Sequence, residues 1–310
     1  MIMTLLLAAL LGVAWLAGVV LPALIALPTR LLSRKLANPT TTLGRLSAGL
    51  FGANAVASPI ILGAGLVLIL GIWGFFAILE DVVMGDPIVA LDDQIYRALQ
   101  TLRTPAFDQL MIAITALGDQ WVVAPVTLAA IALCAYYKRT IAETYLLVAL
   151  AGGALIVGGI KMLIHRPRPA PIYNGPAEFS FPSGHAAVSI VVLGFLAVLL
   201  LQGAPQRWRR AIAFVLSAVV LLISFSRIYL GAHWFSDVAG GLLFGAAWVA
   251  LLAILYLRSA EAPVPAAPLI AITLLAYLGA GAWHISRDFT RETGRYAIPA
   301  TATSGSAKKP

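Results

Sequence analysis

Long apolar runs, each with enough residues to cross a bilayer, constrain this chain more than any other feature. Roughly 20 apolar residues in a helix span a hydrocarbon core of about 30 Å. Hydrophobic residues make up 61% of the 310 residues and charged residues 11%, and the mean hydropathy is +0.93. This composition excludes a soluble globular domain, in which about a quarter of residues are charged, and a disordered chain. We therefore expect an all-α, polytopic membrane helix bundle, with spans at approximately 3–28, 58–80, 119–137, 142–164, 185–203, 211–229, 237–257 and 267–285.

Basic residues in the predicted loops indicate how the bundle is oriented. The first run lacks a basic leader and is too long for a cleaved signal peptide, so we expect it to be retained. Loops after the first, third, fifth and seventh spans carry ten basic residues, namely Arg30, Arg34, Lys35, Arg45, Lys138, Arg139, Arg207, Arg209, Arg210 and Arg258. Loops after the second, fourth and sixth carry four, namely Arg97, Arg103, Arg166 and Arg168. The positive-inside rule therefore predicts that the first set is cytoplasmic and the second lies outside.

The C-terminal segment disagrees with this orientation. It should lie outside, yet it carries Arg287, Arg291, Arg295, Lys308 and Lys309. Either the last segment does not cross the membrane, or distal charges are tolerated there. After about Arg287 the tail is predicted to be disordered, because it ends in small and polar residues.

Three further features of the sequence can be interpreted simply. The net charge of +8 would suggest nucleic acid in a soluble protein, but in a membrane protein it reflects loop charges, and no nucleic-acid partner is expected. The single cysteine, Cys134, excludes an internal disulfide and any cysteine-based metal site. Segment 82–105 spaces Ile95, Leu99 and Leu102 as a helix does, and the polar residues beside them are Asp92, Asp93, Gln94 and Arg97. It is predicted either as a short interfacial helix or as a solvated loop.

Charged and histidine residues gather at four predicted helix ends. They are Lys161, Arg168, His185, Arg227, His233 and Asp237. Because consecutive helices alternate in direction, the end of the fourth span, the start of the fifth, the end of the sixth and the start of the seventh share one membrane face. These six side chains are therefore predicted to converge on one site.

The chemistry of these residues favours a phosphoryl group. Arginine and lysine side chains bind multiply charged anions, and the helix that opens at Ser183 and Gly184 directs unpaired amides toward an anion. His233 and Asp237 are four residues apart, so the acid can orient the ring and leave its other nitrogen as a nucleophile. His185 then remains to protonate a leaving oxygen. No metal is needed, because three cationic side chains supply the positive charge.

Three motifs in this order resemble those of the type 2 phosphatidic acid phosphatase superfamily. They are Lys161 through Arg168-Pro169, Pro182-Ser183-Gly184-His185, and Ser226-Arg227 with His233 and Asp237. The resemblance implies that Lys161, Arg168, Ser183, Gly184 and Arg227 bind phosphate. It also implies a phosphohistidine on His233, with Asp237 orienting that ring, His185 as general acid, and no cofactor or metal. It covers a six-helix core at residues 58–257, preceded by an extra span and loop at 1–57 and followed by a further segment and tail at 258–310.

Other residues near the motifs have ordinary interpretations. His165 and Arg166 are predicted to be solvated loop residues, and His284 an interfacial residue at the end of the last apolar run. Gly241 and Gly245 are one helical turn apart, which is typical of close helix packing.

The sequence thus predicts a multi-pass inner-membrane phosphatase whose active site faces the periplasm or exterior. Its expected partners are the bilayer and a lipid phosphate or diphosphate, of the phosphatidic acid, phosphatidylglycerol phosphate, undecaprenyl diphosphate or lipid A type. Two alternatives stay open: a lipid-linked phosphotransferase, and a transporter or scaffold that binds phosphate without catalysis. The sequence leaves the head group and the oligomeric state undetermined.

Overall fold

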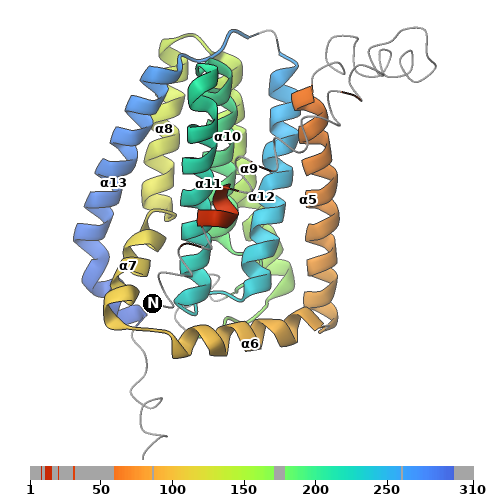
Figure 1. Ribbon diagram of the computed structural model, residues 1–310, viewed down its shortest axis with the longest axis vertical. Coiled ribbons are helices and arrows are strands. Elements are labelled where there is room, and N and C mark those ends of the chain that lie inside the picture. Colours follow the sequence, from red (N-terminus) through yellow and green to blue (C-terminus); the bar gives the residue numbers. More distant parts are fainter. Residues whose placement is uncertain are drawn as a thin grey trace, which may run out of the picture.

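The computed structural model describes residues 59–85, 87–170, 179–259 and 261–296, with a few residues nearer the N-terminus (8, 11–15, 20 and 31). The described part is a bundle of α-helices without strands (Figure 1). The all-α fold class is therefore confirmed. The helices are α5 (Pro59–Met84), α6 (Pro87–Thr101), α7 (Pro105–Ala116), α8 (Gln120–Tyr136), α9 (Thr140–Ile164), α10 (Gly184–Gly203), α11 (Gln206–Tyr229), α12 (Phe235–Leu257) and α13 (Ala266–Arg295).

Seven segments in the described residues are long and apolar enough to cross a membrane. They correspond to the seven predicted spans from 58–80 onward, and the second of them combines α7 with α8. The predicted first span at 3–28 lies almost wholly outside the described residues. The last segment, α13, runs to Arg295, so it is about ten residues longer than the run 267–285.

Helix α6 lies across one end of the bundle, at a steep angle to the spanning helices (Figure 1). Its exposed side carries an ion pair between Asp93 and Arg97, and its inner side buries Leu99 against Ala186 and Ile228. This division of polar and apolar faces is what holds an amphipathic helix flat against a bundle. Segment 82–105 is thus predominantly helical, and the alternative of a solvated loop is wrong.

A break after α7 divides the second spanning segment into two helices. This break was not predicted from the sequence. Thr104 caps α7 by accepting a hydrogen bond from Phe107 N (3.4 Å), and Asp119 caps α8 by accepting one from Trp121 N (3.0 Å). Residues 117–119 join the two helices as a turn. The break therefore places an acidic side chain partway along a membrane-crossing segment.

Close packing of α10 against α12 sets the distance between the two helix starts that carry motif residues. A Cβ added to Gly241 would lie 2.7 Å from Ser183 O, and one added to Gly245 would lie 2.9 Å from Ala187 O. The predicted role of these glycines in helix packing is confirmed. Their lack of side chains allows Ser183 N to donate a hydrogen bond to Asp237 O at 2.9 Å, which ties the two helix starts together.

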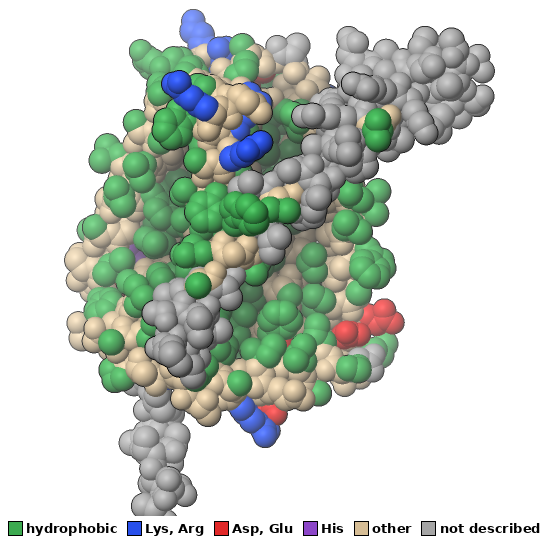
Figure 2. Space-filling model, in the orientation of Figure 1, with side chains coloured by type: hydrophobic (Ala, Val, Ile, Leu, Met, Phe, Trp, Pro, Cys, Tyr) green, Lys and Arg blue, Asp and Glu red, His purple; other side chains and the backbone are tan. Residues whose placement is uncertain are grey.

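Charge is distributed unevenly over the two ends of the bundle. Figure 2 shows an apolar surface around the middle and basic side chains at the end opposite α6. At that end lie the helix termini that carry Lys138, Arg139, Arg207, Arg209, Arg210 and Arg258. The end of α9, the start of α10, the end of α11 and the start of α12 lie together at the α6 end, as alternation of helix direction requires.

Candidate active site

The last turn of α9 and the loop after it carry the first two cationic side chains of the site. Helix α9 ends at His165, a left-handed residue (φ 51°) whose N–H donates to Lys161 O at 3.1 Å. Lys161 Nζ donates to Phe179 O (2.7 Å) and to Ser180 O (3.2 Å), and Arg168 donates to the same Phe179 carbonyl at 3.3 Å. The two cations therefore meet beside the segment that leads into α10.

His233 and Asp237 form a buried pair at the start of α12. Their side chains are 2% and 0% exposed, and His233 Nδ1 lies 3.3 Å from Asp237 Oδ2. The same carboxylate oxygen accepts a hydrogen bond from Trp234 N at 2.9 Å, as in a capping box. A carboxylate beside Nδ1 favours the tautomer with the proton on Nδ1, which leaves a lone pair on Nε2.

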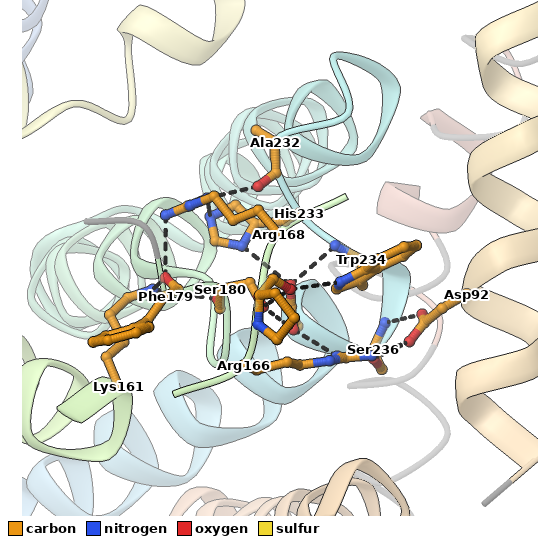
Figure 3. A network of polar contacts seen from close by, with 12 residues as sticks. Asp92, Lys161, Arg166, Arg168, Phe179, Ser180, Ala232, His233, Trp234 and Ser236 are labelled. Atoms are coloured by element: carbon orange, nitrogen blue, oxygen red, sulfur yellow. Dashed lines mark hydrogen bonds and ion pairs between the residues drawn. The ribbon is translucent and has the colours of Figure 1, made fainter. Parts of the chain in front are cut away.

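The second ring nitrogen of His233 faces a guanidinium. Arg168 NH1 lies 2.8 Å from His233 Nε2 and donates to Ala232 O at 2.6 Å (Figure 3). Burial, followed by the charges of Arg168 and Lys161, lowers the pKa of His233 well below 6.5. The ring is therefore neutral at physiological pH, which is the form a nitrogen nucleophile requires.

The start of α10 lies beside the start of α12 at this end of the bundle. Ser183 is fully buried at the N-cap position, but its hydroxyl does not cap the helix and has no hydrogen-bond partner among the described residues. A Cβ added to Gly184 would meet no atom of the described chain within 4 Å, so the space in front of this helix start is open. The first-turn amides lack acceptors within the helix, and they favour an anion there. The side chain of His185 is 22% exposed and lies 3.9 Å from Asp119.

Arg227 is buried near the end of α11, and one of its partners lies beyond the predicted core at 58–257. Its NH1 atom donates to Thr115 Oγ1 (2.9 Å) and to the Tyr296 hydroxyl (2.8 Å). Tyr296 follows α13 directly and is 3% exposed. The prediction of disorder from about Arg287 is therefore wrong for residues 287–296, because a long helix and a buried tyrosine occupy them; residues 297–310 lie outside the described residues.

Arg166 is the clearest error of the sequence-based interpretation. Its guanidinium, on a side chain 10% exposed, donates at 2.7 Å to Asp237 Oδ1, to Asp92 Oδ2 and to Ser236 Oγ (Figure 3). Asp92 is 1% exposed and accepts from Ser236 N at 2.8 Å. Arg166 is therefore not a solvated loop residue, because two buried carboxylates need a cation between them.

A sequence signal for Asp92 was present but unused. Asp92, Ile95, Leu99 and Leu102 recur at helical spacing, so the acid lies on the apolar side of α6. An acid on a buried face requires a partner. His284, predicted to be interfacial, is instead 7% exposed inside the bundle, near Asp119 and Asp288.

The structure therefore brings the predicted residues together at one end of the bundle. Lys161, Arg168, His233 and Asp237 are joined through shared contacts, and Ser183 is tied to Asp237 by its backbone. Arg227 O accepts a hydrogen bond from His233 N at 3.1 Å. No group of three or more His, Cys, Asp or Glu side chains that could hold a metal ion occurs within the described part of the chain.

Part of the chain is similar to known proteins. Residues 142–261 match the PAP2 superfamily. The chain is 29% identical over 175 residues to phosphatidylglycerophosphatase B of Bacillus subtilis, covering 55% of this chain and 86% of that protein. It is 29% identical over 178 residues to an undecaprenyl-diphosphatase of Sulfolobus acidocaldarius (55% and 80%). It is also 33% identical over 125 residues to a lipid A 1-phosphatase of Rhizobium johnstonii (37% and 48%).

A solved structure is similar as well. It is the crystal structure of a transmembrane PAP2-type phosphatidylglycerolphosphate phosphatase from Bacillus subtilis, with a TM-score of 0.54 and 26% identity. The similarity covers 59% of this chain and 93% of that one. Asp92, Thr115, Asp119, His284 and Tyr296 all lie outside the stretch 142–261 that matches the family.

Proposed function

Because residues 142–261 match the PAP2 superfamily, we propose that the chain is an integral-membrane phosphatase that removes a phosphate group from a membrane lipid. The observation that carries this proposal is the buried His233–Asp237 pair, whose outer ring nitrogen faces Arg168 at 2.8 Å beside the open start of α10. A nucleophile, its orienting acid and a set of anion-binding donors thus lie within one site. Binding alone requires only the last of these.

The proposed reaction has two steps. First, His233 Nε2 attacks phosphorus, the bond from phosphorus to the lipid oxygen breaks, and His185 gives its proton to that oxygen. Asp237 accepts the Nδ1–H hydrogen bond and so stabilises the phosphohistidine. Second, His185 takes a proton from water, the resulting hydroxide attacks phosphorus, and the bond from phosphorus to His233 breaks to release inorganic phosphate. Lys161, Arg168 and Arg227 balance the charge on the phosphoryl oxygens in both steps.

A lipid is the favoured substrate because of where the site lies. The motif residues are at the end of the spanning helices, at the level where α6 lies flat across the bundle. A lipid's phosphate occupies this depth, and its chains extend along the apolar helix surfaces. The named relatives include proteins that act on phosphatidylglycerophosphate, undecaprenyl diphosphate and lipid A, and phosphatidic acid is a fourth substrate to test.

We propose further that the site faces the periplasm or exterior of an inner membrane. The basic residues at the end opposite α6 favour a cytoplasmic position for that end. Arg287 and Arg295 lie at the α6 end. There Arg287 forms an ion pair with Asp288, and Arg295 forms one with Glu292.

Topology can be tested with matched cysteine variants in a Cys134→Ala background. Thr101 lies at the site end and Thr140 at the opposite end, and both are exposed. A membrane-impermeant maleimide should label Thr101→Cys but not Thr140→Cys in intact cells. The reverse pattern would place the site in the cytoplasm.

The function is tested by phosphate release from a panel of lipid phosphates and diphosphates by purified protein. We expect His233→Ala to lower kcat at least about a thousandfold, and Asp93→Asn, an exposed acid on α6, to retain full activity. Full activity in folded His233→Ala would refute the proposed nucleophile. Release should be equal with and without EDTA, whereas strict metal dependence would contradict the metal-free mechanism.

The phosphohistidine and its acceptor are tested with labelled substrate. Quenching within one turnover in denaturing detergent at alkaline pH should trap label on the protein in a base-stable form that acid then releases, and His233→Ala should trap none. Label that appears in a second lipid instead of inorganic phosphate would identify a phosphotransferase, which uses the same intermediate with another acceptor.

A further inference from the structure

The break between α7 and α8 lies directly against His185. Asp119 Oδ2 is 3.9 Å from His185 Nε2. The neighbouring Gly118 packs so closely that an added Cβ would lie 2.5 Å from Ile223 Cγ2 on α11, 3.0 Å from Ser189 Oγ and 3.3 Å from His185 Cδ2. A side chain at 118 would therefore clash with α11 and α10, and the glycine lets the break carry an acid beside this histidine.

Helix α13 holds the other side of Asp119. His284 Nε2 lies 3.8 Å from Asp119 Oδ1, and His284 Nδ1 lies 3.2 Å from Asp288 Oδ2. The side chain of His284 is 9% exposed, and its Nδ1 makes no hydrogen bond of good geometry within the described residues. Tyr277, also on α13, donates from its hydroxyl to Leu117 O at 3.1 Å. The break is therefore fixed to α13 at two points.

The charges around His185 explain why an anion is needed there. Lys161, Arg168 and Arg227 are cations of the same site, and positive charge near an imidazole opposes a proton on it. A general acid must nevertheless carry its proton before the leaving oxygen departs. Within the described residues, Asp119 is the carboxylate at ion-pair distance from His185. Asp119 also caps the N-terminus of α8, accepting a hydrogen bond from Trp121 N.

We infer that Asp119 is a positioning residue that pairs with protonated His185 and keeps it ready as the general acid, with His284 holding the far oxygen of Asp119. The inference rests on the proposed function. In the first step the proton passes from His185 to the leaving oxygen, and Asp119 stays ionised. In the second step His185 takes a proton from water and regains its charged partner. The separation of 3.9 Å suits a bridging water, or a contact that shortens when the substrate binds.

The dependence of the rate on the leaving group tests this inference. An alkyl phosphate expels a basic alkoxide that needs a proton, whereas p-nitrophenyl phosphate expels a stable phenolate that does not. In Asp119→Asn we expect kcat for a short-chain alkyl phosphate to fall about a hundredfold, and kcat for p-nitrophenyl phosphate to fall less than about fivefold. Asparagine caps a helix as well as aspartate does, so α8 keeps its start, and Asp93→Asn is the matched control.

The outcomes separate the inference from the proposed function. Equal losses on both esters, or no loss on either, would overturn the role of Asp119 while the phosphatase activity stands. His284→Gln should show the same bias toward the alkyl ester, with a loss of about tenfold, and equal losses there would remove His284 from the arrangement. Unmutated protein that hydrolyses both soluble esters but no lipid would overturn only the lipid substrate. Unmutated protein that hydrolyses none would overturn both.

Discussion

Replacing Arg166 with alanine should damage this protein far more than replacing an arginine on its surface. The change removes two buried ion pairs, to Asp237 and to Asp92, each at 2.7 Å, and a hydrogen bond to Ser236. Asp237 would keep its contacts with Trp234 N and with His233. Both carboxylates would nevertheless stay buried without a cation in contact with them.

The magnitude follows from burial. Removing one partner of a buried ion pair costs about 3–5 kcal/mol, because a charge is left without compensation. The two acids are 0% and 1% exposed and the side chain of Arg166 is 10% exposed, so solvent screens little of this cost. Asp237 would also hold the His233 ring less firmly. We therefore expect kcat to fall about 10- to 100-fold in the protein that remains folded, as for other residues that orient a reacting group.

Equilibrium unfolding in micelles, followed by tryptophan fluorescence, measures the free energy of unfolding. The control is Arg97→Ala, which removes a surface pair with Asp93 and should cost less than about 1 kcal/mol. Asp92→Asn combined with Arg166→Ala should cost less than the two single changes added together, because both act on one network. If Arg166→Ala is no less stable than Arg97→Ala, the reasoning from the buried network is refuted.

Three further predictions concern the packing, pH response and C-terminal contact of the site. Gly241→Ala should destabilise the protein by about 1–3 kcal/mol, because the added Cβ would lie 2.7 Å from Ser183 O. The control Gly158→Ala should be neutral, because its Cβ would meet no atom of the described chain within 4 Å. Equal unfolding curves for the two variants would contradict this reasoning. The pKa of His233 is held well below 6.5, so the unfolded chain binds the extra proton as pH falls through 6.5 and the free energy of unfolding should fall. Thermal unfolding at about pH 7.5 and 5.5 should show a smaller loss for His233→Asn than for the unmutated protein, and equal losses would argue against a neutral buried ring. Tyr296→Phe removes the hydroxyl 2.8 Å from Arg227, so it should lower the free energy of unfolding by about 1 kcal/mol and weaken binding of the phosphate ester. The control Tyr136→Phe, at an exposed tyrosine, should change neither quantity. An unaltered free energy of unfolding and KM in Tyr296→Phe would count against this contact.

Sequence reasoning succeeded where a residue's position along a helix determined its place in space. Lys161, His233 and Asp237 lie at helix ends, and alternation of helix direction is enough to bring those ends to one face. The spacing of four residues between His233 and Asp237 predicted their contact directly. Long apolar runs likewise located most of the described spans to within a few residues. The exceptions are α13, which continues past its apolar part, and the segment of α7 and α8, which begins at Pro105 and not near residue 119.

The contacts that were missed depend on packing between elements far apart in the chain. Arg166 meets Asp92 across 74 residues, and Arg227 meets Tyr296 across 69 residues. Such pairs leave no periodicity in the sequence, so an arginine in a loop and a tyrosine after a helix appear ordinary. The break at residues 117–119 was hidden for a related reason, because the apolar run of α8 gave no sign that α7 continues the same span.

Tyr296 also bears on the order in which the site is completed during synthesis. The motif residues emerge from the ribosome between Lys161 and Asp237, well before α13 is made. The Tyr296 hydroxyl reaches Arg227 only after the whole of α13 has been inserted beside α7 and α8. A nascent chain that stops after α12 would already hold every motif residue, but its Arg227 would lack this contact. Full phosphate affinity should therefore arise late in biosynthesis, when the last helix enters the membrane.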